Sequence, residues 1–469
     1  MINWTDQNLG KDWVKKLFWV GVVITLVIFL FNFTLIGFGV YGDGIGYYTP
    51  LRSLIFDGDL QIYDEYEYLS YSKSNFSGVA RVDKAIPQYS KYTLGLGLML
   101  SPFFALGHLA TLIANTLGLE IEPNGLTWSY ELFYCLGSIT LGILGLIACY
   151  KAARLFFSQT ASVLGVAGIW FASPLSFYLT LEVSMSHAVS QFLISVFLYI
   201  CISTAWVKQR RQQILLGLVL GLGTFVRLQN ILFAIVPITM IIWNIINRVI
   251  KANQISRNFP WKGMIKFPDI TSLVVIGLVT CLMQLPQMFI YQWQYSSFFK
   301  IPYLEEGGAE GYESSFNWIK PQISNVLFSG HRGLFFWHPV LLLSIIGLIL
   351  VYKKLPILVT SFLLAFGLQV YLVSSWWCWW QGSSFGGRMF INCSLIFVWG
   401  LAAFWDNLSY KRSRLIGVGV TLFLIGWNVL LILQYESGMI PSEDAVTIGE
   451  VLGNQLFAIP HFINHVFNR

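Results

Sequence analysis

The segment 41–60, YGDGIGYYTPLRSLIFDGDL, gathers acidic and aromatic side chains directly after the first long apolar run of the chain. Asp43 stands between Gly42 and Gly44, and glycines let the backbone bend sharply and approach a substrate. A carboxylate here could accept the proton of a hydroxyl group while that oxygen attacks a sugar carbon. The ordinary alternative is a solvated aspartate that caps the helix following it.

Four more side chains of this segment are candidates for a site. Tyr47 and Tyr48 could bind a substrate. Asp57 and Asp59 flank a glycine, a spacing that could share a divalent cation or hold sugar hydroxyls. The same Asp-Gly pattern is common in ordinary turns. If a metal is needed, its candidate ligands are Asp43, Asp57 or Asp59, and no other cofactor is indicated.

Ionisable side chains also occur at or inside later apolar runs. Glu182 and His187 lie at the outer start of one run, in LEVSMSHAVSQ, where ionisable groups are costly, although they could be a snorkelling or capping pair. His187 is a candidate for binding a substrate. Arg227 lies in the apolar stretch GLGTFVRLQN, where a guanidinium needs an anionic partner, either a carboxylate or a lipid phosphate.

Two further segments place cations at the ends of spans. His331 and Arg332 lie in FSGHRGLFFWHP, and Arg388 ends WWCWWQGSSFGGR. Two arginines and a histidine could hold a phosphate and stabilise it as it leaves. They could instead anchor helices at the lipid headgroups, as we expect of the tryptophans in 376–380. The glycines in 382–387 indicate a loop shaped for close approach, which anchoring does not require.

The composition places this chain in a lipid bilayer. Of its 469 residues, 56% are hydrophobic and only 11% are charged, whereas soluble domains carry about 25% charged residues. The formal net charge of +6 does not indicate a nucleic-acid partner, because the basic residues form short runs at the ends of apolar segments. The six cysteines show neither metal-ligand spacing nor a disulfide framework.

The apolar runs predict an all-α polytopic membrane protein with about eleven transmembrane helices. The predicted spans are 17–40, 128–150, 160–178, 183–206, 214–228, 229–247, 270–292, 333–352, 355–375, 389–406 and 414–434. The run 93–118 is apolar enough to span, but we expect it to lie at the membrane surface, broken by Pro102. If it crossed, the later basic clusters would face outward, against the positive-inside rule.

The sidedness of the chain follows from this choice. The basic clusters, from the lysines in 11–16 to those in 248–266 and 411–414, fall on the cytoplasmic side together with the N-terminus. A first outer loop of about 41–127, with membrane-surface helices, then belongs to one transmembrane domain over 1–434. The residues 435–469 are expected to form a tail on the outer side.

The order of these motifs resembles the GT-C superfamily of polytopic glycosyltransferases, especially bacterial envelope-glycan transferases. The motifs are Gly-Asp-Gly-x-Gly-Tyr-Tyr after the first span, Ser-His-Ala at an outer helix start, Gly-Leu-Gly-x-x-x-Arg, Ser-Gly-His-Arg-Gly-Leu-Phe-x-Trp-x-Pro and Trp-x-x-Gly-x-x-Phe-Gly-x-Arg. Protein O-mannosyltransferases and the lipid A aminoarabinose transferase look more distant. The resemblance extends to about residue 434.

The resemblance implies an inverting transfer of a sugar from a polyprenyl-phosphate donor to an acceptor hydroxyl. The acceptor would be a lipid, a glycan or a protein, and the active site would be extracytoplasmic in a bacterial plasma (inner) membrane. By position, Asp43 matches the aspartate regarded as the base. Arg388, Arg332 and His331 fall where contacts to the donor phosphate are expected, and Arg227 is a further candidate.

In one respect the chain departs from this pattern. Many relatives have Asp-Glu where this chain has Asp43 followed by Gly44. The second carboxylate is therefore unassigned, with Asp57 as the preferred substitute, and the need for a divalent cation stays open.

Two other functions would fit some of the same sequence features. A transporter or flippase of lipid-linked sugars is disfavoured, because such proteins place charged or broken helices near the bilayer midplane and often show repeated halves. A polymerase or ligase of lipid-linked glycans would use the same donor and differs only in its product.

Overall fold

The described part of the chain is helical. The computed structural model describes residues 11–72, 88–204, 206–255, 267–304, 315–408 and 411–467. Within these ranges the β-type pairing is limited to an isolated antiparallel bridge between Phe316 and Trp376. The predicted all-α class is therefore confirmed. Much of the predicted basic cluster at 248–266 lies outside the described residues.

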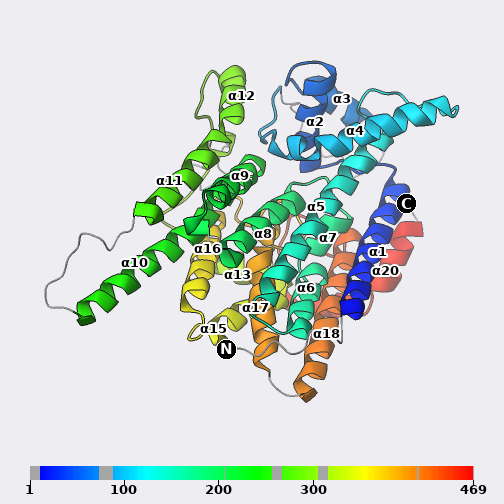
Figure 1. Cartoon of the computed structure of the whole chain (residues 1–469). Coiled ribbons are helices and arrows are strands. Elements are labelled where there is room, and N and C mark those ends of the chain that lie inside the picture. Colours follow the sequence, from blue (N-terminus) through cyan, green and yellow to red (C-terminus); the bar gives the residue numbers. More distant parts are fainter. Residues whose placement is uncertain are drawn as a thin grey trace.

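The helices follow one another along the chain and form a tilted bundle capped by a group of crosswise helices (Figure 1). The first half contains α1 (Lys11–Ile36), α2 (Asp43–Phe56), α3 (Tyr63–Ser72), α4 (Gly95–Thr116), α5 (Trp128–Arg154), α6 (Gln159–Phe171), α7 (Leu175–Thr180), α8 (His187–Ser203), η1 (Trp206–Lys208), α9 (Arg210–Val226) and η2 (Leu228–Ala234). The second half contains α10 (Ile235–Ile255), α11 (Phe267–Leu282), α12 (Leu285–Tyr295), η3 (Pro302–Leu304), α13 (Ile323–Phe328), α14 (Leu334–Trp337), α15 (Pro339–Leu350), α16 (Pro356–Ser375), η4 (Arg388–Cys393), α17 (Ser394–Asn407), α18 (Lys411–Glu436), α19 (Ile448–Gln455) and α20 (Ala458–Phe467).

Eight stretches of the described chain are helices long and apolar enough to cross a membrane. Three shorter apolar helices, α6, α8 and α15, coincide with predicted spans. The multi-pass character is confirmed, whereas the number eleven is not. The predicted span 214–228 corresponds to α9, which has 17 residues and two arginines in its first turn.

Helix α4 is among the eight long apolar helices, although its sequence was predicted to lie at the membrane surface. In Figure 1 it runs crosswise to α5 and α18 at the end of the bundle that also holds α2 and α3. Its buried residues include Leu96, Leu100 and Phe104, while Leu106, Leu109 and Leu112 are exposed. A helix that lies flat on a membrane places one face on protein and another in lipid, so this orientation agrees with a surface helix.

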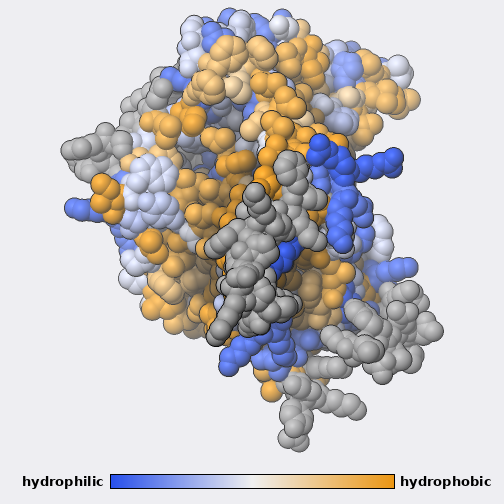
Figure 2. Space-filling view, turned by 60° about the vertical axis from the view of Figure 1, so that its left-hand side comes forward, coloured by the Kyte–Doolittle hydropathy of each residue, from blue (hydrophilic) through white to orange (hydrophobic). Residues whose placement is uncertain are grey.

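The flanks of the bundle are apolar. Figure 2 shows a broad hydrophobic area on one face of the molecule, with hydrophilic residues around its edges. Helix α11 exposes an apolar residue at every fourth position: Ile270, Val274, Leu278 and Leu282. Residues four apart share one helix face, so this face of α11 is suited to lipid rather than to water.

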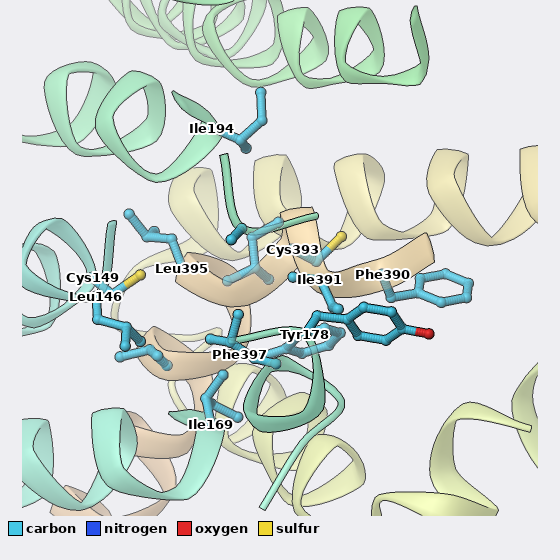
Figure 3. Packing of buried hydrophobic residues seen from close by; sticks show 14 of the residues in the cluster. Leu146, Cys149, Ile169, Tyr178, Ile194, Phe390, Ile391, Cys393, Leu395 and Phe397 are labelled. Atoms are coloured by element: carbon cyan, nitrogen blue, oxygen red, sulfur yellow. The ribbon is translucent and has the colours of Figure 1, made fainter. Parts of the chain in front are cut away.

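The interior of the bundle fixes the helix η4, which begins at Arg388. Figure 3 shows Phe390, Ile391 and Cys393 of η4 packed beside residues of α5, α6, α7, α8 and α17. Helix η4 contacts α8, α16 and α17. The backbone that carries Arg388 is therefore anchored in the best-packed part of the molecule.

Helices α15 and α17 approach each other at glycines. A Cβ atom added at Gly400 would overlap the carbonyl oxygen of Ser344, and one added at Gly347 would overlap the carbonyl oxygen of Gly400. Within a bilayer, small residues at a helix interface let backbones approach and gain van der Waals contact. This contact holds α17, and with it η4, in place.

We expect Gly400→Ala to lower the melting temperature of the purified protein, because overpacking a tight contact costs roughly 1–3 kcal/mol. The matched control is Gly367→Ala on α16, where an added Cβ would meet no atom within 4 Å. The control should melt at or slightly above the wild-type temperature, since alanine favours a helix by up to about 1 kcal/mol over glycine. Equal melting temperatures for the two variants would contradict the close packing.

Candidate active site

Asp43 and Arg388, which are far apart in the sequence, form an ion pair. The Oδ2 atom of Asp43, the first residue of α2, lies 3.1 Å from Nη1 of Arg388, the first residue of η4. The Arg388 side chain is 9% exposed and that of Asp43 is 39% exposed. The two residues that the sequence ranked first are thus brought together at the edge of the interior.

The surroundings keep Asp43 ionised. Burial by itself would raise its pKa, but the charges of Arg388 and Lys91, with hydrogen bonds from Tyr92 and Arg388, lower the pKa below the ordinary value of 3.8. Burial also raises the pKa of Tyr92 well above its ordinary value, so this phenol stays protonated and can donate to Asp43. Lys91 and Tyr92 were missed from the sequence, because they lie in a polar stretch with no distinctive motif.

A buried carboxylate holds the backbone just before Asp43. Oε2 of Glu131, in the first turn of α5, accepts the N–H groups of Gly39 and Val40 at 2.8 Å each. A Cβ at Gly39 would lie 2.8 Å from Sγ of Cys135. The link between α1 and α2 is therefore bound to α5. Glu131 was missed, although a glutamate inside a predicted span is itself a sign of a special role.

The turn 181–186 packs against the start of α2. A Cβ at Gly44 would overlap the hydroxyl oxygen of Ser184, so a side chain has no room directly after Asp43. In the same turn, Met185 accepts Nη1 of Arg388 on its sulfur at 3.7 Å. The turn thus contacts both members of the ion pair, and it also carries Glu182.

Arg227 contacts both His187 and the helix η4. Nη1 of Arg227 donates to Nδ1 of His187 at 2.6 Å, and Nη2 donates to the sulfur of Met389, the neighbour of Arg388, at 2.6 Å. Because arginine has no acceptor, His187 must accept through Nδ1 and carry its proton on Nε2. Among the described residues Arg227 has no carboxylate partner. Its charge is therefore available to an anion.

The loop before Arg388 has the shape that its glycines suggested. Gln381, Gly382 and Gly386 have φ values of 71°, 71° and 58°, in the left-handed region that favours glycine. Gln381 accepts the backbone N–H of Met389 through Oε1 at 2.7 Å. The Nε atom of Arg388 is buried and has no hydrogen-bond partner in the described part of the chain. Arg388 thus keeps a donor for a ligand.

Backbone carbonyl groups bind the guanidinium of Arg332, which the sequence predicted to bind a phosphate. Its guanidinium donates to the carbonyl oxygens of Ser384 at 3.1 Å, Asp444 at 2.7 Å and Pro441 at 3.0 Å, and also to that of Ser442. Only 1% of Arg332 is exposed. Four of its five N–H donors bind backbone oxygens, and these bonds join the segment 437–447 to the loop before Arg388. The first part of the predicted C-terminal tail is thus bound to the body of the bundle.

His331 lies among tryptophans. Its ring stacks on Trp380 at 5.3 Å between centroids and meets the edge of Trp379 at 5.7 Å. Burial, and then the charge of Arg332, lower the pKa of His331. Nε2 of His331 is buried and has no hydrogen-bond partner in the described part of the chain. The predicted contact between His331 and the donor phosphate therefore stays a prediction.

Of the two predicted tyrosines, one borders the ion pair. Tyr47 stacks on Tyr92, the residue that donates to Asp43, with centroids 4.1 Å apart. Tyr48 is completely buried, and its hydroxyl donates to the carbonyl oxygen of Gly125. Tyr48 is therefore part of the core and not a substrate contact.

Asp57 and Asp59 lie at the far end of α2. The helix has 14 residues, which at 1.5 Å per residue separates Asp57 from Asp43 by about 20 Å. Asp57 pairs with Arg52, and Asp59 accepts the hydroxyl of Ser53 at 2.7 Å. The length of α2 therefore argues against Asp57 as the second carboxylate beside Asp43. Among the described residues, no group of three or more His, Cys, Asp or Glu side chains is arranged to hold a metal.

No protein-family model matches this chain, and no curated protein matches it in sequence. Among solved structures, it is similar to ArnT from Cupriavidus metallidurans bound to undecaprenyl phosphate, with 13% identity, a TM-score of 0.49, and coverage of 97% of this chain and 76% of that one. It is also similar to the archaeal oligosaccharyltransferase AglB from Archaeoglobus fulgidus in complex with an inhibitory peptide and a dolichol-phosphate, with 14% identity and a TM-score of 0.47. The match covers 98% of this chain and 56% of AglB. Similarity at this level does not transfer an activity to this chain.

We expect Arg332→Lys to lower the melting temperature markedly, because one ammonium cannot satisfy four carbonyl oxygens, and each lost charge-assisted hydrogen bond costs roughly 1.5–3 kcal/mol. Thermal unfolding in detergent would measure this. A wild-type melting temperature for Arg332→Lys would contradict the structural role of this arginine.

Proposed function

We propose that this chain is an inverting glycosyltransferase that moves a sugar from a polyprenyl-phosphate donor to an acceptor hydroxyl on the extracytoplasmic side of the membrane. The observation that carries the proposal is the ion pair between Asp43 and Arg388 at the border between interior and surface. A base and a phosphate-binding cation in one place are the two groups that a single displacement at the anomeric carbon requires.

The steps follow from the side chains. The donor phosphate binds to Arg388, whose Nε has no partner among the described residues, with Arg227 as a second cation nearby. The acceptor hydroxyl gives its proton to the Asp43 carboxylate while its oxygen bonds to the anomeric carbon. The bond between that carbon and the phosphate oxygen breaks with its electron pair on the phosphate, where the arginines stabilise the charge.

Donor binding itself activates the base. In the resting structure Arg388 is paired with Asp43, so the incoming phosphate must compete with this carboxylate. Once Arg388 turns to the phosphate, the largest influence that lowers the pKa of Asp43 is removed, and burial then raises the pKa. Asp43 therefore becomes a stronger base only when a donor is present, which favours an order in which the donor binds first.

The surroundings suit a lipid-borne donor. The described part of the bundle exposes apolar faces along its flanks, and Arg227 lies where α9 passes into η2, a helix that continues into the apolar α10. A phosphate on a membrane-embedded lipid could reach these arginines from the bilayer, while Asp43, with 39% of its side chain exposed, faces the acceptor. The acceptor class stays open among a lipid, a glycan and a protein.

Asp43→Asn should reduce sugar transfer roughly 100-fold or more, because the amide cannot accept the proton. It should bind undecaprenyl phosphate as tightly as the wild type or more tightly, since the competitor for Arg388 is weakened. Transfer is measured with a panel of polyprenyl-phosphate sugars, and binding is measured in nanodiscs.

Two matched variants complete this experiment. Arg388→Gln should weaken binding of undecaprenyl phosphate by about tenfold or more, as expected for losing a charge-assisted contact. Asp57→Asn, at the other end of α2, should behave like the wild type in both assays. Undiminished transfer by Asp43→Asn would remove this residue from the role of base.

A further inference from the structure

Glu182 is a second carboxyl beside the ion pair, held there by the turn 181–186. This turn is tied to the link before α2, because the Tyr41 hydroxyl donates to the carbonyl oxygen of Leu181 at 2.9 Å. Ser184 of the turn fills the space next to Gly44, and Met185 contacts Arg388. The turn is therefore fixed from three sides, and Glu182 cannot move away without disturbing the site.

One oxygen of this carboxyl has no partner. Oε2 of Glu182 is buried and makes no hydrogen bond in the described part of the chain. A buried polar atom without a partner is costly, and in native proteins such atoms usually find their partner in water, an ion or a ligand. The location beside Arg388 indicates which ligand would supply it.

The charges around Glu182 decide its protonation. Burial raises its pKa from 4.5 to about 8, and the charges of Glu436 and Asp43 add to this effect, while Arg388 opposes it. The ionisable groups that face it are Tyr41, Asp43, Tyr178, Arg388, Tyr435 and Glu436. At neutral pH its carboxyl group is thus largely protonated, whereas the pKa of Asp43 is shifted in the opposite direction. Two carboxyl groups with opposite shifts are suited to opposite roles.

We propose that the carboxyl O–H of Glu182 donates a hydrogen bond to the donor phosphate held at Arg388, which makes Glu182 a further donor-binding residue. This inference rests on the proposed function, because it takes the phosphate of that reaction as the ligand. The neutral acid can donate to a phosphate oxygen, whereas an ionised Glu182 would repel the phosphate and compete for Arg388.

The same arrangement accounts for Gly44, which follows Asp43 where the resembled family often has an acid. Ser184 excludes any side chain at position 44, and the turn that carries Ser184 brings Glu182 to the site instead. Glu182, and not Asp57 about 20 Å away along α2, supplies the second carboxyl.

The test is the pH dependence of undecaprenyl phosphate binding to the full-length protein in nanodiscs. For the wild type, we expect the affinity to fall about tenfold between pH 7 and pH 9 as Glu182 ionises. Glu182→Gln still offers an N–H donor but cannot ionise, so it should bind a few-fold more weakly at pH 7 and lose nothing further by pH 9. In transfer assays this variant should raise the KM for the donor and leave kcat within about twofold.

Two further variants sharpen the result. Glu436→Gln removes a charge that raises the pKa of Glu182, so the fall in affinity should begin at lower pH. Asp57→Asn removes a distant acid and should keep the wild-type profile. Melting temperatures recorded at each pH separate a loss of binding from a loss of folding.

The outcomes distinguish this inference from the proposed function. If Glu182→Gln loses affinity with pH as steeply as the wild type, or if Glu436→Gln leaves the profile unmoved, Glu182 is not the titrating donor. Either result would leave the roles of Asp43 and Arg388 intact. If the predicted profiles appear but no polyprenyl-phosphate sugar is consumed, the phosphate contact stands and the transferase proposal fails.

Discussion

The arrangement of this molecule depends on one buried cation that has to be neutralised. Arg388 begins a helix in the packed interior with 9% of its side chain exposed, and a charge in that position is costly without a partner. In the resting state Asp43 supplies the negative charge, and a lipid phosphate is suited to replace it. The stability of the site and its affinity for the donor therefore both depend on an anion beside Arg388. The resting ion pair must be strong enough to hold the site together and weak enough for a phosphate to displace it.

Two separate devices hold the partners of this pair. On one side, Glu131 binds the backbone before Asp43, and Ser184 presses on Gly44 just after it. On the other side, Arg332 ties the loop before Arg388 to the segment that follows α18. Residues far apart in the sequence thus help to fix the distance of 3.1 Å between Asp43 and Arg388. Because each device is made of buried charge or tight backbone contact, a small change in either one should disturb both the site and the stability of the fold around it.

The fold class could be predicted from the sequence because the apolar composition indicates a membrane protein. Asp43 and Arg388 could be predicted because neighbouring glycines indicate a backbone that approaches a ligand closely. The different roles of Arg332 and Arg388 could not be predicted from the sequence, since both residues follow glycine-containing segments at the end of a span. They depend on whether backbone oxygens or a carboxylate surround each guanidinium, which is a property of tertiary structure. Asp57 was misjudged because the acidic residues of 41–60 were assigned to one site, whereas α2 holds the two ends of the segment about 20 Å apart. From the sequence alone Glu182 could be a helix cap, because its position beside Arg388 depends on how the turn 181–186 packs in the tertiary structure.

Arg388 and Arg227 differ in whether a carboxylate balances their charge, and this difference indicates an order in which they bind a phosphate. Arg388 is balanced by Asp43, while Arg227 donates only to a neutral histidine, an amide oxygen and a sulfur among the described residues. An arginine without a carboxylate attracts an anion, and an anion drawn to Arg227 arrives next to Met389, one residue from Arg388. The unbalanced cation would therefore capture the phosphate, and the balanced one would be exchanged in a second step. Exchange frees Asp43 at the moment when the phosphate is in place, so the carboxylate stays paired in the resting state and is released as a base when the donor has bound.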